Sequence, residues 1–482
     1  MFESTSTFMH DPLPEEALPE EPLAHGLKQR HLTMLGLGGV IGAGLFVGSG
    51  AGISVAGPGI IVSYLLAGAL AMLVMRMLGE MSAAMPASGS FSVHAERALG
   101  RWAGFSVGWL YWFLLVVVLA VEATGAAKIA NGWVPGFPQW AWVLVFMVFF
   151  TVSNLAAVKN FGEFEFWFAA LKVGAIVLFL VLGTLAIVGW LPDTDPVGLA
   201  NLTGQGGFLP NGWGGVVSGV LAVVFAFGGL EVVTIAAAES DDPARSVARA
   251  VRSAVWRILF FYVGSMLVIV TLLPWRSAKP DESPYVAVLD SIGVGSAGQI
   301  MNVVVFVALL SALNANLYGS SRMIFSLAER GEAPQALLAV SGGGVPRRAV
   351  FASVAFGFVS VLLNLLWPTS VFLYMLNAVG AVLLFVWVLI AVSQLRLRRR
   401  IEREVPERLV LRMWAFPYLT WAALAAMAAV LVLMLFDDGA RPQLLWSGGA
   451  TAVVLAVAFW RERRGGGGSG ADREAGAVSS TV

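Results

Sequence analysis

Twelve apolar segments dominate this sequence and restrict the folds that it can adopt. A helix needs about 20 mostly apolar residues to cross the roughly 30 Å hydrocarbon core of a bilayer. Segments near that length lie at about 32–56, 58–84, 102–130, 139–157, 166–190, 213–238, 254–274, 297–326, 348–367, 370–394, 413–436 and 443–460. With 58% of its 482 residues apolar and 12% charged, the chain also lies outside the range of soluble domains. The sequence therefore predicts an all-α integral membrane protein with twelve transmembrane helices.

Basic residues fall mainly in alternate loops between these segments. The densest basic loop, Arg396 to Arg412, joins segments ten and eleven, whereas loops on the opposite side keep little beyond Arg276, Lys279 and Arg441. Loops on the cytoplasmic side of a membrane carry an excess of Lys and Arg. This alternation predicts a multi-pass protein of the cytoplasmic membrane with both termini in the cytoplasm.

Polar tails flank the apolar part of the chain. Residues 1–25 are acidic and rich in proline, and they lack the basic start of a secretory signal. Residues 463–482 are polar and rich in glycine. We expect a disordered cytoplasmic N-terminal tail, a single transmembrane domain over 26–462, and a flexible cytoplasmic C-terminal tail.

Several classes of chemistry are disfavoured by what the sequence lacks. It has no cysteine, and its four histidines (His10, His25, His31 and His94) lie outside the long apolar segments. It contains neither the G-x-x-x-x-G-K-[ST] phosphate loop nor the H-E-x-x-H zinc motif. We therefore expect no metal, no cofactor, no enzymatic activity, no nucleic-acid partner and no ATPase partner.

Two apolar segments contain helix-breaking glycines. The first carries "GGVIGAGLFVGSG" (Gly38 to Gly50) and the sixth carries "VVFAFGGLEVV" (Val223 to Val233). Glycine is unfavourable inside a helix, and broken helices in corresponding positions of two halves indicate a secondary transporter built from inverted repeats. The alternative is that these glycines only allow helices to pack closely.

The chemistry of a broken helix also suggests the transported solute. Unwound backbone at membrane depth is tolerated where it lines a polar cavity. A half-helix N-terminus presents free amides to a carboxylate, and a half-helix C-terminus presents carbonyls to an ammonium group. An amino acid carries both groups, so the pattern favours an amino acid.

A series of motifs resembles a known family. "GLKQRHLTMLGLGGVIGAGLFVGSG", "GEMSAAMPASGSF", "GEFEFWFAALKV", "TIAAAESDDPARSVARAV" and "LNANLYGSSRMIFSLAERGEAP" resemble the amino acid transporter family of the amino acid–polyamine–organocation (APC) superfamily, and the resemblance covers roughly residues 26–460. "WVPGFPQW", "FLPNGWGGVVSGV" and "RMWAFPYLTW" are most similar to the bacterial γ-aminobutyrate (GABA) permeases. Relatives that carry aromatic amino acids, proline or basic amino acids share most of these motifs.

The resemblance implies an architecture and a mode of transport. The fold would be LeuT-like, with a 5+5 inverted repeat over about 30–190 and 211–394, helices 1 and 6 broken, and two extra C-terminal helices over about 413–460. Transport would be proton-coupled and would follow alternating access.

The resemblance also implies a substrate site at the two breaks. The amides around Gly42, Ala43 and Gly44 would receive the substrate carboxylate. Carbonyls near Phe225 and Gly228 would receive the amino group. Phe227 would be an aromatic lid over the pocket and take part in gating.

Three ionisable residues lie within the predicted spans: Glu122, Lys172 and Glu231. Such residues cost at least about 2.5 kcal/mol at the bilayer centre, so they are functional candidates. By resemblance, Lys172 takes the place of the cation of sodium-coupled relatives and serves proton coupling, with Ser320 and Ser321 on the hydroxyl side of that site. The alternative for Lys172 is a static ion pair with a buried glutamate.

The two glutamates have different expected roles. Glu122 faces either the pocket or a neighbouring helix, and helical periodicity does not decide between them. In the pocket it would receive the distal ammonium of an ω-amino acid or exchange the coupled proton. Glu231 matches a family glutamate and would tie helix 6 to a neighbour during gating. Arg76 and Glu80 lie four residues apart on one helix and are expected to be structural.

These observations predict proton-driven import of an amino acid, most specifically GABA, with the lipid bilayer and protons as the other partners. A permease for an aromatic amino acid, proline or a basic amino acid is the alternative, as is an amino acid exchanger. A membrane-embedded amino acid sensor and a channel are further candidates. A sensor is disfavoured because the sequence has no sizeable soluble output domain, and a channel because broken helices suit alternating access.

Overall fold

The computed structural model describes residues 41–87, 90–156, 161–191, 196–231, 243–280, 282–293, 296–340, 345–437 and 441–465. In these ranges the chain is helical and contains no strand. The expectations for the two tails fall outside the described residues, apart from the end of the last helix. So does the part of the first break that precedes Ile41.

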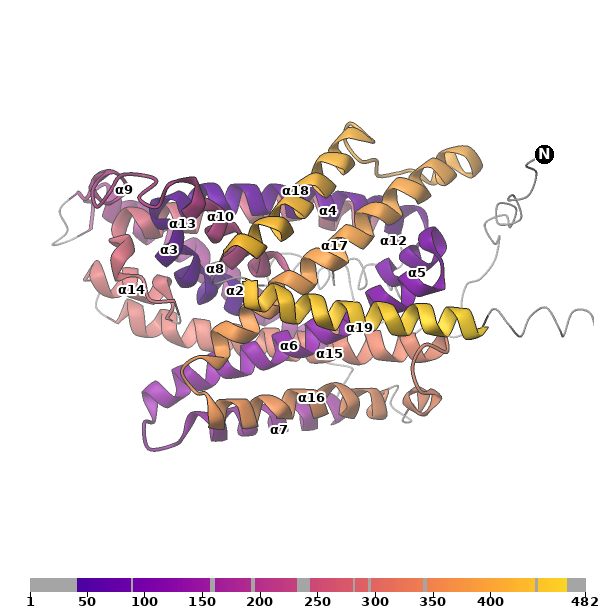
Figure 1. Ribbon diagram of the computed structural model, residues 1–482. Helices are drawn as coiled ribbons and strands as arrows, with labels where there is room; N and C mark the ends of the chain where they lie inside the picture. Colours follow the sequence, from indigo (N-terminus) through magenta and orange to yellow (C-terminus); the bar gives the residue numbers. More distant parts are fainter. Residues whose placement is uncertain are drawn as a thin grey trace, which may run out of the picture.

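The helices form one elongated bundle (Figure 1). In chain order they are α2 (Ala43–Phe46), α3 (Gly48–Ala56), η2 (Gly57–Gly59), α4 (Ile60–Ala84), α5 (Ser90–Leu99), α6 (Arg101–Trp133), α7 (Gln139–Ala156), α8 (Phe161–Ile187), α9 (Ala200–Thr203), α10 (Gly212–Val223), η3 (Val224–Phe227), α12 (Pro243–Arg257), η4 (Ile258–Val263), α13 (Gly264–Leu272), η5 (Trp275–Ser277), α14 (Pro284–Ser291), α15 (Ala297–Glu329), η6 (Gln335–Leu338), α16 (Arg347–Leu366), α17 (Val371–Glu404), η7 (Pro406–Arg408), α18 (Tyr418–Phe436) and α19 (Arg441–Gly465).

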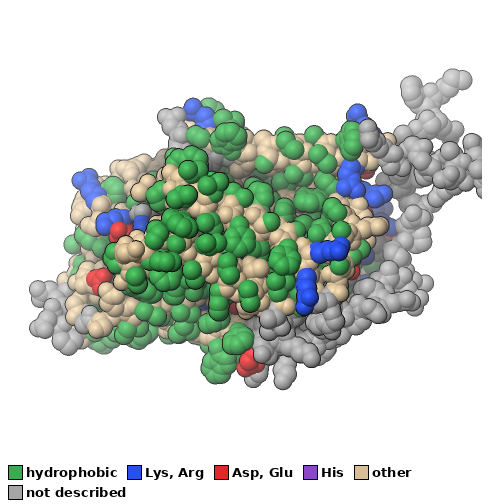
Figure 2. Space-filling model, turned by 90° about the horizontal axis from the view of Figure 1, so that it is seen from below, with side chains coloured by type: hydrophobic (Ala, Val, Ile, Leu, Met, Phe, Trp, Pro, Cys, Tyr) green, Lys and Arg blue, Asp and Glu red, His purple; other side chains and the backbone are tan. Residues whose placement is uncertain are grey.

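Eight helices in the described part of the chain are long and apolar enough to cross a membrane, and three shorter apolar helices accompany them. Figure 2 shows hydrophobic side chains over most of one face, with Lys and Arg side chains mainly toward its two ends. A helix that is apolar all round is either buried or in contact with lipid. The expectation of an all-helical, multi-pass membrane protein is therefore confirmed.

Helix α6 forms the centre of the bundle, with α15, α17 and α19 packed along it (Figure 1). In its most apolar stretch 83% of the residues are buried, compared with 22% in α18 and in the corresponding stretch of α19. Most side chains of this stretch are therefore held inside the protein, whereas α18 and α19 present most of their side chains to the surroundings. Glu122, on α6, is one of those interior residues.

A buried polar network joins α4, α17 and the segment before α18. The carboxylate of Glu80 pairs with Arg398, and it also accepts hydrogen bonds from Gln394 Nε2 (2.7 Å) and from the amide of Met413 (2.5 Å). Arg76 instead donates to the carbonyl of Arg412 (2.8 Å) and lies over the ring of Trp414. Glu80 therefore connects separate helices rather than pairing with Arg76 along its own helix.

Replacing Arg398 should destabilise the protein strongly. Arg398→Met leaves the Glu80 carboxylate buried without its cation, a change that typically costs about 3–5 kcal/mol. Arg400→Met is the matched control, because the Arg400–Glu404 pair on the same helix is partly exposed and should contribute less than about 1 kcal/mol. Melting temperatures of the purified variants in detergent test this, and equal melting temperatures would contradict it.

Candidate functional site

At the first break, a glutamate side chain accepts hydrogen bonds from the backbone amide at the start of α2. The backbone is extended at Gly42 (φ −149°, ψ −144°) and turns helical at Ala43. The amide of Ala43 donates to both carboxylate oxygens of Glu122, at 3.1 Å each. Glu122 is 3% exposed. It therefore faces the break in the first helix, a point that periodicity left open.

Glycines at this break allow two close approaches. A Cβ at position 42 would lie 2.4 Å from Oε1 of Glu122, and a Cβ at position 44 would lie 2.6 Å from Cα of Ala226. Ala226 belongs to η3, so the two breaks approach each other closely. The two breaks are about 180 residues apart in sequence, but they lie next to each other in the fold.

The second break consists of η3 and the glycines that follow it. After α10, the chain forms a tight turn over Val224–Phe227, becomes extended at Gly228 (φ −64°, ψ 146°), and takes a positive φ of 90° at Gly229. The carbonyl of Phe225 accepts the amide of Gly228 at 2.9 Å. A carbonyl oxygen has a second lone pair, so this contact leaves the Phe225 carbonyl able to accept another donor.

Phe227 is fully buried at the second break and packs against two tyrosine rings, which also contact each other. Its ring stacks on Tyr262 of η4 with centroids 5.0 Å apart, and it meets Tyr64 of α4 edge-on at 5.9 Å. Helix η4 is a single π-helical stretch, a feature that often occurs at functional sites. Phe227 therefore links the second break to α4 and to the helix that contains η4.

Glu231 follows the second break and connects it to two long helices. One of its oxygens accepts the indole N–H of Trp387 on α17 at 2.5 Å. The other accepts the hydroxyl of Tyr111 on α6 at 3.3 Å and the amide of Gly229 at 2.9 Å. The residue is fully buried. The break is thus anchored to both α6 and α17 by one carboxylate.

Lys172 on α8 is fully buried beside a second glutamate. Its Nζ lies 3.9 Å from Oε1 of Glu165, which also accepts the hydroxyl of Ser311 at 2.9 Å. Glu165 is likewise fully buried. Sequence reasoning missed it because the predicted fifth segment began at residue 166, whereas α8 begins at Phe161. Its spacing of seven residues from Lys172, which is two helical turns, was the available signal.

Ser320 and Ser321 lie on α15, two to three turns beyond Ser311. Their hydroxyls donate to carbonyls of their own helix, those of Leu317 (3.1 Å) and Tyr318 (2.8 Å). In the described part of the chain, the serine that reaches the Lys172 region is Ser311. The proposed roles of Ser320 and Ser321 therefore rest on the resemblance.

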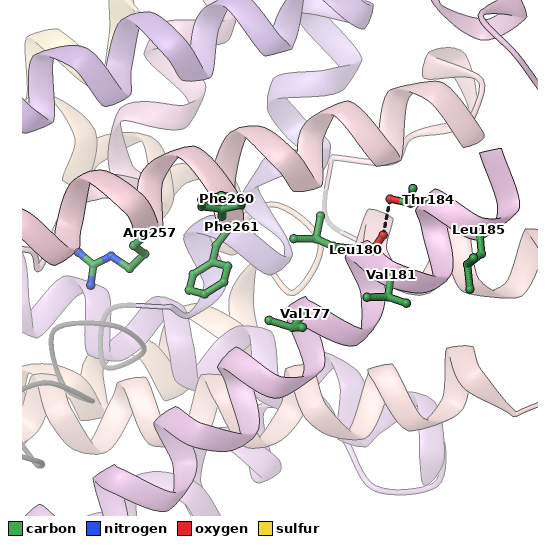
Figure 3. A pocket seen from close by; sticks show the side chains of 8 residues that line it. All are labelled: Val177, Leu180, Val181, Thr184, Leu185, Arg257, Phe260 and Phe261. Carbon is green, nitrogen blue, oxygen red and sulfur yellow. Dashed lines mark hydrogen bonds between the residues drawn. The ribbon is translucent and has the colours of Figure 1, made fainter. Parts of the chain in front are cut away.

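A separate apolar pocket lies between α8 and η4 (Figure 3). Its volume is about 530 Å³, and it is lined by Val177, Leu180, Val181, Thr184, Leu185, Arg257, Phe260 and Phe261. Figure 3 shows Arg257 at one end of this row of side chains. None of the residues predicted to bind substrate lines it. Several lining residues are about half exposed, including Val177, Val181 and Phe260, so the pocket opens at the outer surface of the helix bundle.

Comparison with known proteins gives a consistent result along the chain. A family model described as amino acid permease matches residues 31–460. The chain is 50% identical over 439 residues to the gamma-aminobutyric acid permease of Bacillus subtilis. This alignment covers 91% of this chain and 94% of the relative. It is 44% identical over 453 residues to the gamma-aminobutyric acid permease of Escherichia coli, and this alignment covers 93% of this chain and 97% of the relative.

A relative with a different name is almost as similar. The chain is 49% identical over 432 residues to the aromatic amino acid transport protein AroP of Corynebacterium glutamicum, covering 89% of this chain and 93% of the relative. The resemblance inferred from the motifs is confirmed. Because the family match spans most of the described helices and both breaks, the chain belongs to the amino acid permease family.

Proposed function

We propose that this permease imports GABA across the cytoplasmic membrane by proton symport and alternating access. The observation that carries the proposal is the bond between the Glu122 carboxylate and the amide of Ala43. It supports carboxylate recognition at the first break, because a side-chain carboxylate already uses the amide assigned to the substrate. Two of the relatives above are named gamma-aminobutyric acid permeases.

The proposed architecture has twelve crossings, with both termini in the cytoplasm. The stretch Ala43–Ala84 contains α3 and α4, separated by η2, and would account for the first two crossings. The other seven long helices and the three shorter apolar helices would supply the remaining ten. The contact between Gly44 and Ala226 supports pairing of crossings one and six, as in a 5+5 inverted repeat.

The contact between Glu122 and Ala43 suggests how substrate and proton are linked. The substrate carboxylate needs the amides around Gly42, Ala43 and Gly44, and Glu122 occupies that of Ala43. On binding, the substrate would displace Glu122 from this amide. The displaced carboxylate is buried and requires a new positive partner, which is either the distal ammonium of the substrate or the coupled proton.

Gating would involve the second break. The amino group of the substrate would reach carbonyls near Phe225 and Gly228, beneath the ring of Phe227. Glu231 would hold the break against α6 and α17 through Tyr111 and Trp387. A change at the break would thereby be transmitted to both long helices.

An aromatic amino acid is the second candidate substrate, and the relative named AroP supports it. The two candidates make different demands on the pocket. An α-amino acid holds both charged groups on one carbon, and its side chain needs an apolar compartment. In GABA three methylene groups separate the charged groups, so the ammonium needs its own acceptor and the pocket needs no such compartment.

We expect ω-amino acids of similar length to compete with GABA. The experiment is uptake of labelled GABA into proteoliposomes under an imposed pH gradient, with excess unlabelled competitors. 5-Aminovalerate and β-alanine should reduce the signal, because each places an ammonium within reach of Glu122 or the second break. Phenylalanine and lysine should not. Strong competition by phenylalanine together with no uptake of GABA would reassign the protein to aromatic amino acids.

A further inference from the structure

A buried acid–base pair connects the proposed coupling site to the beginning of α8. Lys172 and Glu165 are both fully buried, and their charged atoms are 3.9 Å apart. Side chains on a helix point back toward its N-terminus. Lys172 can therefore reach Glu165 across two turns, or about 10 Å along the helix axis.

The pair is incompletely satisfied. In the described structure, neither Nζ of Lys172 nor Oε2 of Glu165 has a hydrogen-bond partner. A buried ion pair is stable only where close geometry and further hydrogen bonds offset its desolvation. Ser311 supplies one hydrogen bond to Glu165 Oε1, and Nζ receives none. At 3.9 Å the two groups form an ion pair without a hydrogen bond, so a proton passes between them when they move into hydrogen-bond distance or through one bridging water.

The charged neighbours of the pair are few. Lys172 interacts electrostatically with Glu165 and with Glu122, whereas Glu165 interacts with Lys172 and Ser311. Two tyrosines, Tyr262 of η4 and Tyr285 of α14, also lie on elements near α8. They interact with each other, and Tyr285 contacts α8 at Phe179. Lys172 thus pairs with Glu165 and also interacts electrostatically with Glu122, the carboxylate that contacts the first break.

Polar side chains continue from Glu165 toward one end of the bundle. Ser311 donates to Glu165, and Asn314, one turn further along α15, accepts from Asn154 Nδ2 at 2.8 Å. Asn154 is partly exposed and lies two residues before the end of α7. In the proposed topology, that end of α7 and the beginning of α8 are both cytoplasmic.

The geometry points to Glu165 as the group that accepts the coupled proton from Lys172 on its way to the cytoplasm, with Ser311 as its positioning residue. This inference rests on the proposed proton symport. The proton leaves Nζ of Lys172 and binds a carboxylate oxygen of Glu165, so the ion pair becomes a neutral amine and a neutral acid. Glu165 then releases the proton toward the cytoplasmic side, and Lys172 is recharged by the next proton to arrive from the substrate site.

Glu165→Gln separates coupling from substrate binding. The glutamine keeps the shape and accepts the Ser311 hydroxyl, but it does not exchange a proton. We expect this variant to lose accumulation driven by a pH gradient, and to lose the proton influx that accompanies substrate, read by a pH dye trapped inside proteoliposomes. Counterflow of labelled against unlabelled substrate without a gradient should stay close to wild type.

Two further variants complete the test. Glu163→Gln is the matched control, since Glu163 is an exposed carboxylate two residues earlier on the same helix, and it should behave as wild type. Ser311→Ala retains both charges and should shift the pH dependence of uptake while leaving counterflow unchanged. This second variant keeps the inference testable if Glu165→Gln does not fold.

The outcomes distinguish this inference from the function on which it rests. If wild-type uptake does not respond to a pH gradient, the proposed symport fails. If wild type responds and Glu165→Gln still accumulates substrate, or Ser311→Ala leaves the pH dependence unchanged, only the role of Glu165 is overturned. Equal loss of counterflow and accumulation in a folded Glu165→Gln protein would reduce Glu165 to a structural residue.

Discussion

We expect Gly44→Ala to weaken substrate binding and uptake strongly, whereas Gly48→Ala should leave both close to wild type. A Cβ at position 44 would lie 2.6 Å from Cα of Ala226, and backbone of the second break cannot yield as a flexible side chain does. A Cβ at position 48 would meet the Leu376 side chain at 3.4 Å, which is an ordinary contact. Forcing extra atoms into a packed site costs about 1–3 kcal/mol, so affinity should fall roughly 10- to 100-fold.

The measurement is binding of labelled substrate to purified protein, followed by uptake into proteoliposomes. Size-exclusion profiles and melting temperatures of both variants separate a local effect at the breaks from unfolding. Normal binding by a well-folded Gly44→Ala protein would show that the two breaks do not need their close approach for substrate recognition.

Lys172→Met should eliminate concentrative uptake altogether. The substitution removes the cation that pairs with Glu165 and leaves that buried carboxylate uncompensated, which typically costs about 3–5 kcal/mol. The single variant should therefore also melt at a lower temperature. The double variant Lys172→Met/Glu165→Gln removes both charges and should regain stability without regaining accumulation.

Uptake under an imposed pH gradient, with and without a proton ionophore, is the readout for both variants. Wild type should lose accumulation when the ionophore collapses the gradient, and a sodium gradient should not replace it. Accumulation at the wild-type level by Lys172→Met would leave the residue only a packing role. Recovery of accumulation by the double variant would support the static ion pair instead.

The positions of the long helices could be predicted from the sequence because lipid leaves the backbone few choices. Within hydrocarbon, a chain must satisfy its own amides and carbonyls, so an apolar segment of sufficient length becomes a helix. The segment predicted at 102–130 is α6, Arg101–Trp133, in the structure. The segment predicted at 348–367 is α16, Arg347–Leu366.

Helix ends were predicted less well, because polar residues continue some helices beyond the apolar segments. Helix α17 runs to Glu404, ten residues past the predicted end, and its extension is anchored where Arg398 pairs with Glu80. The helix predicted to start at 254 begins at Pro243, and it contains a π-helical stretch, Ile258–Val263. Apolar content alone carries no signal for either feature.

The candidate site was predicted in residue type but not in contacts. The glycines at both breaks and the charged residues within the spans could be identified from the sequence. Glycine inside a helix and a charge inside the bilayer are both energetically unfavourable, so each indicates a functional site. The partner of Glu122 could not be identified in this way, since Ala43 lies 79 residues away in sequence. Glu165 was missed because its side chain is assigned to the interior by the start of α8 and by packing against α15, not by local hydropathy.

By itself the sequence determined that this protein spans a membrane many times as helices, that two of its apolar segments are interrupted by glycine, and that it belongs among amino acid permeases. These properties follow from composition, spacing and motifs that act locally along the chain. Only the tertiary structure decided which groups meet: Glu122 with the Ala43 amide, Gly44 with Ala226, and Lys172 with Glu165. These contacts join residues of different helices or of different turns of one helix. They depend on how the helices pack and rotate against one another. Hydrophobic periodicity does not specify that rotation when every face of a helix is apolar.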